Sequence, residues 1–141
     1  MEADLASADP AQRGGLFDKA AALYWHFTTP HDAGIGPAKI HKVPHVKRPL
    51  FYPVLDRLVR RLYRVQARMW INQIPDTRRG DSVTFWAAIR EDLIDRDNNS
   101  ALQLHRDALR TAPQTAPMAD LPSLRLLDIV AWETARREIG T

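Results

Sequence analysis

The stretch that decides the fold is residues 56–69, DRLVRRLYRVQARM. At about 100° per residue, its arginines fall within roughly 100° of one another on a helix, and its larger apolar side chains fall on a second arc. The stretch therefore predicts an amphipathic helix with an arginine ladder across from an apolar seam. The ladder consists of Arg57, Arg60, Arg61, Arg64 and Arg68, and the seam consists of Leu55, Leu58, Leu62, Val65 and Met69.

The arginine ladder has almost no acid to neutralise it. Asp56 is the one acidic residue in the stretch. A solvated helix face usually mixes acids with bases, because opposite charges at i,i+4 stabilise a helix and like charges destabilise it. We therefore expect the missing negative charge on a partner, whose carboxylates or phosphates guanidinium groups bind bidentately. The alternative is that the arginine stems only cover apolar surface.

The composition bounds the class of protein. The chain has 141 residues, of which 45% are hydrophobic, and this suits one compact domain. It contains no cysteine, which excludes disulfides, thiolate metal sites and cysteine catalysis. The net charge of +3 is small, so the basic character is local, and the composition is compatible with a nucleic-acid partner but does not imply one. We do not expect nucleic acid as the partner. No apolar run is long enough for a membrane span.

The remaining sequence predicts an all-α fold. Prolines recur between residues 30 and 53 and predict extended chain, whereas residues 1–15 have the composition of a flexible tail. We therefore expect a long extended N-terminal arm over residues 1–52 and a three-helix domain over residues 53–141. Helices are predicted at 16–28, at about 53–72, from 81 or 82 to 97–99, at 100–110 as a short helix or a continuation, and from 120, with Asp120 as the cap, to 140.

Catalytic and metal-binding patterns are not found in the sequence. His41 and His45 have a spacing that suits a metal on a helix, but Pro44 lies between them. There is no glycine-rich phosphate loop and no nucleophile or metalloprotease motif. We expect a protein that is not an enzyme and has no metal site. Helical spacing favours a core role for the aromatic residues over base stacking.

The tripeptide Leu62-Tyr63-Arg64 lies in this arginine-rich helix. A turn containing Pro75 and a second segment, residues 85–98 (FWAAIREDLIDRDN), follow it. This arrangement resembles the LYR-motif family of small three-helix mitochondrial matrix proteins, over about residues 53–98. In residues 85–98 a leucine or isoleucine stands where the family usually has phenylalanine, and residues 1–50 have no counterpart.

The resemblance implies a partner, the acidic mitochondrial acyl carrier protein. It implies no cofactor of the chain's own, because the carrier supplies acyl-4'-phosphopantetheine. The implied carrier-binding residues are Arg57, Arg60, Arg61, Tyr63, Arg64, Arg68 and Arg90, and those implied to line the acyl chain are Leu58, Leu62, Val65, Trp86, Ile89 and Leu93.

The resemblance also implies a location in the mitochondrial matrix, on the inner membrane. An apolar arm rich in proline would gain order against a large permanent neighbour. We therefore expect a non-catalytic accessory subunit of a respiratory complex, with complex I favoured by family analogy. One alternative is a LYR-type assembly factor for iron–sulfur proteins or respiratory complexes. An alternative of another class is a basic helical protein associated with the mitoribosome or RNA.

Overall fold

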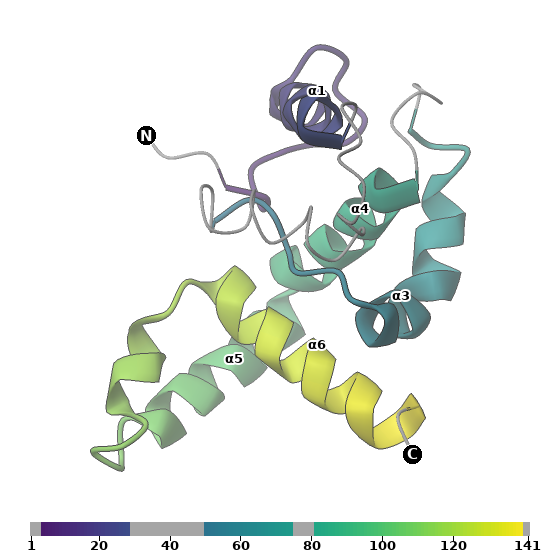
Figure 1. Cartoon of the computed structure of the whole chain (residues 1–141). Coiled ribbons are helices and arrows are strands. Elements are labelled where there is room, and N and C mark those ends of the chain that lie inside the picture. Colours follow the sequence, from purple (N-terminus) through teal and green to yellow (C-terminus); the bar gives the residue numbers. More distant parts are fainter. Residues whose placement is uncertain (1–3, 29–49, 75–80, 140–141) are drawn as a thin grey trace.

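The structure, a computed structural model, describes residues 4–28, 50–74 and 81–139, and these residues contain helices and no strand (Figure 1). The expected all-α class is confirmed for them. No helix in these ranges has both the length and the apolar character needed to cross a membrane. The elements are α1 (Leu16–Thr28), α3 (Arg57–Trp70), α4 (Asp81–Ile94), α5 (Arg96–Leu109), the 3-10 helix η2 (Ala116–Asp120) and α6 (Ser123–Ile139).

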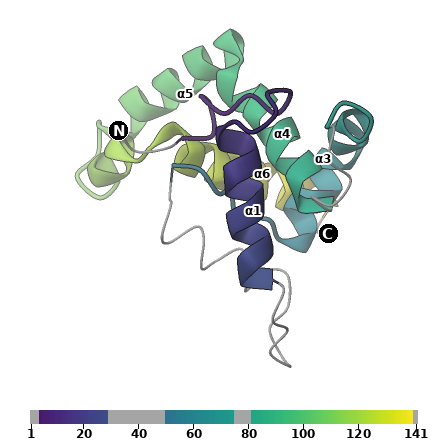
Figure 2. The same ribbon diagram turned by 90° about the horizontal axis from the view of Figure 1, so that it is seen from above.

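Helix α3 packs against both α4 and α6, and these last two also contact each other. Helix α5 continues from the end of α4 and packs mainly against η2, so that the two form a limb away from α1 (Figure 1). Helix α1 lies above α4 in Figure 1 and crosses the middle of the molecule when it is viewed from above (Figure 2).

The centre of the core is Trp86 on α4, which is fully buried. Among the described residues, four aromatic rings meet it edge-on. Phe17 and Tyr24 of α1 have ring centroids 6.1 and 5.0 Å from that of Trp86, and Phe51 and Tyr52 have theirs at 6.4 and 5.3 Å. Edge-to-face contacts of this kind add stability beyond the burial of apolar area. Trp86 thus joins the N-terminal residues to the helices that follow.

Residues 4–15 are not the flexible tail that their composition predicts. Leu5, Ala8 and Phe17 are completely buried in the same hydrophobic cluster as the side chains of α3, α4 and α6. The backbone N–H of Leu5 donates to the carbonyl of Leu50 at 3.0 Å. The cluster therefore contains residues from both sides of the predicted boundary at residue 52. The proline-rich part of the predicted arm, residues 29–49, lies outside the described residues.

Two aspartates define helix boundaries that differ from those predicted from the sequence. Asp56 accepts a hydrogen bond from the backbone N–H of Val59 at 2.9 Å, so α3 begins at Arg57 and not near residue 53. Asp95 has extended backbone angles and caps α5 through the N–H of Asn98. The second helix therefore ends at Ile94, and the prediction that it reaches residues 97–99 is wrong.

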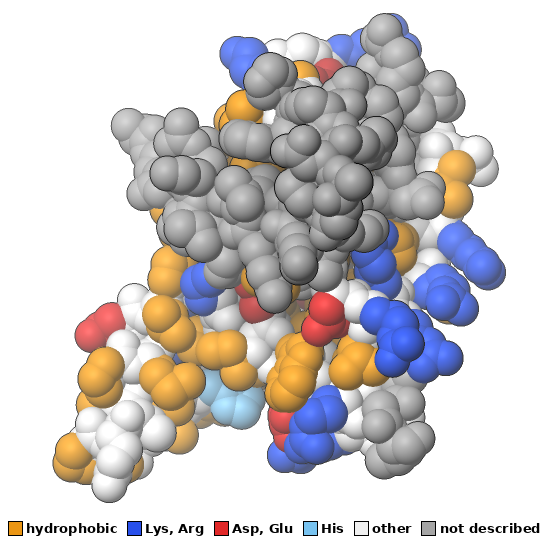
Figure 3. Space-filling view, in the orientation of Figure 1, with side chains coloured by type: hydrophobic (Ala, Val, Ile, Leu, Met, Phe, Trp, Pro, Cys, Tyr) orange, Lys and Arg blue, Asp and Glu red, His pale blue; other side chains and the backbone are white. Residues whose placement is uncertain are grey.

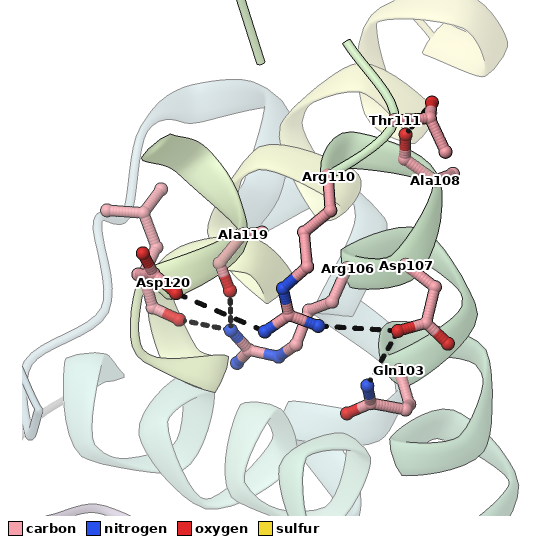
Figure 4. A network of polar contacts seen from close by, with 9 residues as sticks. Gln103, Arg106, Asp107, Ala108, Arg110, Thr111, Ala119 and Asp120 are labelled. Carbon is pink, nitrogen blue, oxygen red and sulfur yellow. Dashed lines mark hydrogen bonds and ion pairs between the residues drawn. The ribbon is translucent and has the colours of Figure 1, made fainter. Parts of the chain in front are cut away.

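Arg106 holds the turn between α5 and α6. Its Nη1 donates to the carbonyl of Ala119 at 2.6 Å (Figure 4). The same Nη1 donates to the carbonyl of Leu121 at 2.6 Å, and Nη2 donates to Ser123 Oγ at 3.0 Å. Asp120 was expected to cap the last helix. It is instead the last residue of η2, and α6 begins at Ser123.

Candidate functional site

The face of α3 that enters the core is not the predicted apolar seam. The buried residues of α3 are Val59, Tyr63 and Ala67, each about 4% exposed or less. Val65 and Met69, which were expected in the core, are 68% and 66% exposed. That expectation is wrong because the helix has two apolar arcs, and α4 and α6 pack on the less hydrophobic one.

The rest of the seam lies at the edge of the core. Leu58 and Leu62 are half-buried, whereas Leu55 is buried but precedes the helix. Leu58, Leu62, Val65 and Met69 thus form a partly exposed apolar strip along α3, and we use the name apolar strip for these four residues.

Tyr63 of the tripeptide points into the protein. It is 4% exposed, and its hydroxyl donates to Asp92 Oδ2 on α4 at 2.7 Å. Burial and the neighbouring carboxylate raise the pKa of Tyr63 above its ordinary value of 10.0, so it stays neutral. The expectation that Tyr63 faces a carrier protein is therefore not met, because its position one turn from Val59 and Ala67 places it on the buried face.

Four of the predicted arginines form an exposed surface, which we call the basic face of α3: Arg57, Arg61, Arg64 and Arg68. Lys and Arg side chains gather there on the right-hand side of Figure 3. Among the residues that the structure describes, none of the four makes an ion pair. The acid missing from the sequence is therefore not supplied by a described residue elsewhere in the fold.

Two other predicted arginines are turned toward the protein. Arg60 is half-buried, its Nη2 donates to Ser82 Oγ at 3.1 Å, and its guanidinium lies 5.1 Å from the centre of the Phe85 ring. Arg90 is also half-buried, and its Nε is shielded from solvent. Both residues are less available to a partner than the basic face is.

The predicted acyl-lining residues do not lie together. Trp86, Ile89 and Leu93 are 0%, 2% and 7% exposed and belong to the hydrophobic core. Val65 is on the surface, and Leu58 is half-buried. Leu62 lines a groove of about 280 Å³ between α3, α5 and α6.

This groove was not predicted from the sequence. Its aliphatic walls come from α3, α5 and α6, and its polar groups come from four helices. No local signal joins these residues, because they span positions 62 to 134. The polar residues that line it, besides Tyr63, are Gln66, Asp92, Asn98, His105 and Thr134.

A buried ion pair fixes the segment before α3 onto α6. Arg125 Nη1 lies 2.8 Å from Asp128 Oδ2, and Arg125 Nη2 donates to the carbonyl of Tyr52 at 2.6 Å. The N–H of Val54 donates to the other oxygen of Asp128 at 3.4 Å. Burial raises the pKa of Asp128 to about 7, although the charge of Arg125 opposes this rise. The pair has a structural role that was not predicted from the sequence.

Metal-ligating residues do not cluster in residues 4–28, 50–74 and 81–139, where no group of three or more His, Cys, Asp or Glu side chains could hold an ion. His41 and His45 lie outside these ranges. His105, which lines the groove, is exposed.

The fold and the surface define an all-helical protein with a basic helix face that no described residue pairs. Residues 1–135 match the family described as "Family of unknown function (DUF6308)", and the chain belongs to this family. The match is continuous and includes residues 1–50, for which the LYR-motif resemblance has no counterpart. No curated protein and no solved structure matches the chain.

Proposed function

We propose that this protein is a non-catalytic docking protein whose basic face of α3 binds an acidic helix on the surface of a protein partner. The observation that carries the proposal is the set of four exposed arginines on one helix, none of which has an ion-pair partner among the described residues. The proposal follows from charge complementarity between this face and carboxylates.

The basic face weakens the isolated helix. Arg57 and Arg61, Arg61 and Arg64, and Arg64 and Arg68 are neighbours at i,i+3 or i,i+4 spacing. Each like-charged pair costs roughly 0.2–0.5 kcal/mol. Carboxylates on a partner would remove this repulsion, and bidentate hydrogen bonds would add specificity. Arginines that merely covered apolar surface would not need to stand next to one another.

The apolar strip explains why a protein is a better partner than nucleic acid. Val65 and Met69 are highly exposed beside the arginines, and Leu58 and Leu62 continue the strip. Protein interfaces typically have an apolar centre with a polar rim and are enriched in arginine and methionine. An amphipathic helix with acids beside its apolar stripe matches both parts of this surface.

The LYR-motif resemblance supplies a particular candidate, the mitochondrial acyl carrier protein, which is an acidic helical protein. On this finer proposal the chain is an accessory subunit of a respiratory complex, with complex I favoured, or an assembly factor in the mitochondrial matrix. Its support is the sequence pattern over about residues 53–98, and the basic face would make the contact in place of Tyr63.

The test uses charge reversal on the basic face and a control reversal on another helix. Arg64→Glu combined with Arg68→Glu reverses two charges of the face. Arg96→Glu reverses one exposed arginine that has no ion pair among the described residues, at the first position of α5. A glutamate suits that position because of the helix dipole. Circular dichroism of all three proteins should be the same.

Binding is measured by calorimetry with three probes: purified acyl carrier protein, a designed acidic amphipathic peptide and a duplex RNA. We expect the unaltered protein and Arg96→Glu to bind the acidic peptide, and the double variant to bind it at least tenfold more weakly, a loss in the range of truncated charge pairs. Equal peptide affinity for all proteins would overturn the docking function. If the protein binds the acidic peptide but not the acyl carrier protein, only the assignment of the carrier as partner fails. Stronger binding to RNA than to the peptide would favour a protein associated with the mitoribosome or RNA.

A further inference from the structure

The groove between α3, α5 and α6 contains a carboxylate that no described cation neutralises. Asp92 lines the groove and makes no ion pair with any residue of the described ranges. No lysine or arginine is among the residues that line it. The lining of the groove therefore includes an acid and no lysine or arginine, although Leu62, Tyr63 and Gln66 of the arginine-rich α3 contribute to it.

Neighbouring side chains hold Asp92 in a fixed place. The buried Tyr63 hydroxyl donates to Asp92 Oδ2 at 2.7 Å, and Asn98 Nδ2 donates to the backbone carbonyl of Asp92 at 3.1 Å. The hydroxyl and the amide that donate these bonds carry no charge, so they orient the residue but do not balance its charge. A ligand that carries a positive charge meets a carboxylate that is already positioned.

The remaining walls suit an apolar stem. Leu62, Leu102, Leu127 and Val130 contribute aliphatic surface from three helices, and together with Asp92 they form one hollow. A carboxylate next to apolar walls interacts more strongly with a cation than it does in bulk water. Charge-assisted hydrogen bonds are roughly twice as strong as neutral ones.

We infer that this groove binds a small primary amine as its ammonium ion, with the nitrogen at Asp92 and an alkyl stem along the aliphatic wall. Its volume of about 280 Å³ lies just below the range of roughly 300–1,000 Å³ that is typical of drug-sized ligands, so the ligand is small. The inference goes beyond the proposed docking function and does not depend on it, because the arginines of the basic face do not line the groove.

The experiment compares hexylammonium, 1-hexanol and hexanoate as probes of the full chain. The three share an apolar stem and differ in the charge of the head group. Binding is followed by amide chemical shifts in two-dimensional NMR, so that the residues of the groove report directly. We expect hexylammonium to bind at least tenfold more tightly than hexanol, which corresponds to a charged hydrogen bond, and hexanoate to bind most weakly.

Two variants and a control connect the binding to the groove. Asp92→Asn keeps an acceptor for Tyr63 and should lower the affinity for hexylammonium to that for hexanol. Ala101→Leu adds bulk to the wall formed by α5 and should weaken both probes. Glu91→Gln removes a neighbouring exposed carboxylate on α4 and should change neither. Equal affinity for hexylammonium and hexanol, or an unchanged preference in Asp92→Asn, would overturn the inference, whatever the outcome at the basic face.

Discussion

Replacing Phe17 by alanine tests whether the N-terminal segment is part of the core or is a flexible arm. Phe17 is 0% exposed, and its ring centroid lies 6.1 Å from that of Trp86 in an edge-on contact. Truncation of a buried phenylalanine costs about 3–5 kcal/mol, and lost edge-to-face contacts account for about 0.5–1.5 kcal/mol of such a loss. Because domains are stable by about 5–15 kcal/mol, this is a large share of the total. We therefore expect the midpoint of thermal unfolding to fall by roughly 10–20 °C.

The matched control is Leu23→Ala on the same helix. Leu23 is 40% exposed, so its truncation should cost no more than about 1 kcal/mol. Urea unfolding is followed by circular dichroism and by tryptophan fluorescence, to which Trp86 contributes. If Phe17→Ala and Leu23→Ala have the same free energy of unfolding, residues 4–24 do not belong to the core and the reasoning about the fold is refuted.

Three further predictions concern buried charge and helix capping. Arg125→Met leaves Asp128 buried without its partner and should lower the free energy of unfolding by about 3–5 kcal/mol at pH 8, measured by denaturant unfolding. Adding Asp128→Leu should restore much of this loss. No recovery in the double variant would mean that the broken pair is not the cause of the loss. Burial raises the pKa of Asp128 to about 7 from an ordinary value of 3.8, so the folded protein takes up a proton that the unfolded chain releases between these values. Stability should therefore fall as pH rises from about 4 to 7, and Asp128→Asn should flatten this slope; an unchanged slope would contradict the assignment. Asp56→Ala removes the acceptor of the Val59 N–H and should cost about 1 kcal/mol, with Asp56→Asn close to the original protein.

The helices could be predicted from sequence because their signals are local. The spacing of Phe17, Ala20, Leu23 and Tyr24 predicted helix 16–28, and α1 has these bounds. Phe17, Ala20 and Tyr24 are buried as expected, whereas Leu23 is 40% exposed. The second helix was expected to end at residues 97–99, with residues 100–110 as a short helix or a continuation, and the break lies instead at Asp95. An aspartate inside a polar segment is compatible both with a continuous helix and with a new cap, and the packing of the two segments decides between them.

Which side of α3 is buried could not be predicted from its own residues. Leu58, Leu62, Val65 and Met69 form the more hydrophobic arc, yet Val59, Tyr63 and Ala67 enter the core. The polar contact that favours this choice, Tyr63 to Asp92, joins residues 29 positions apart. The spacing of apolar residues along one helix cannot predict a contact with a residue on another helix. The arginine ladder was found from sequence because repeated charge on one helix is a local property, whereas the groove depends on tertiary packing.

The choice of buried face also bears on function. A helix that turned its more hydrophobic arc inward would remove Val65 and Met69 from water, and each such burial is worth about 1.5–3 kcal/mol. In this fold those side chains stay 68% and 66% exposed, next to arginines that repel one another. Two unfavourable features on adjoining exposed arcs of one helix are both relieved by the same event, the arrival of an acidic amphipathic surface. Replacing Val65 and Met69 by glutamine should therefore stabilise or leave unchanged the isolated protein and weaken binding of the acidic peptide; if it destabilises the isolated protein by more than about 1 kcal/mol, these side chains serve the fold and the argument for docking fails.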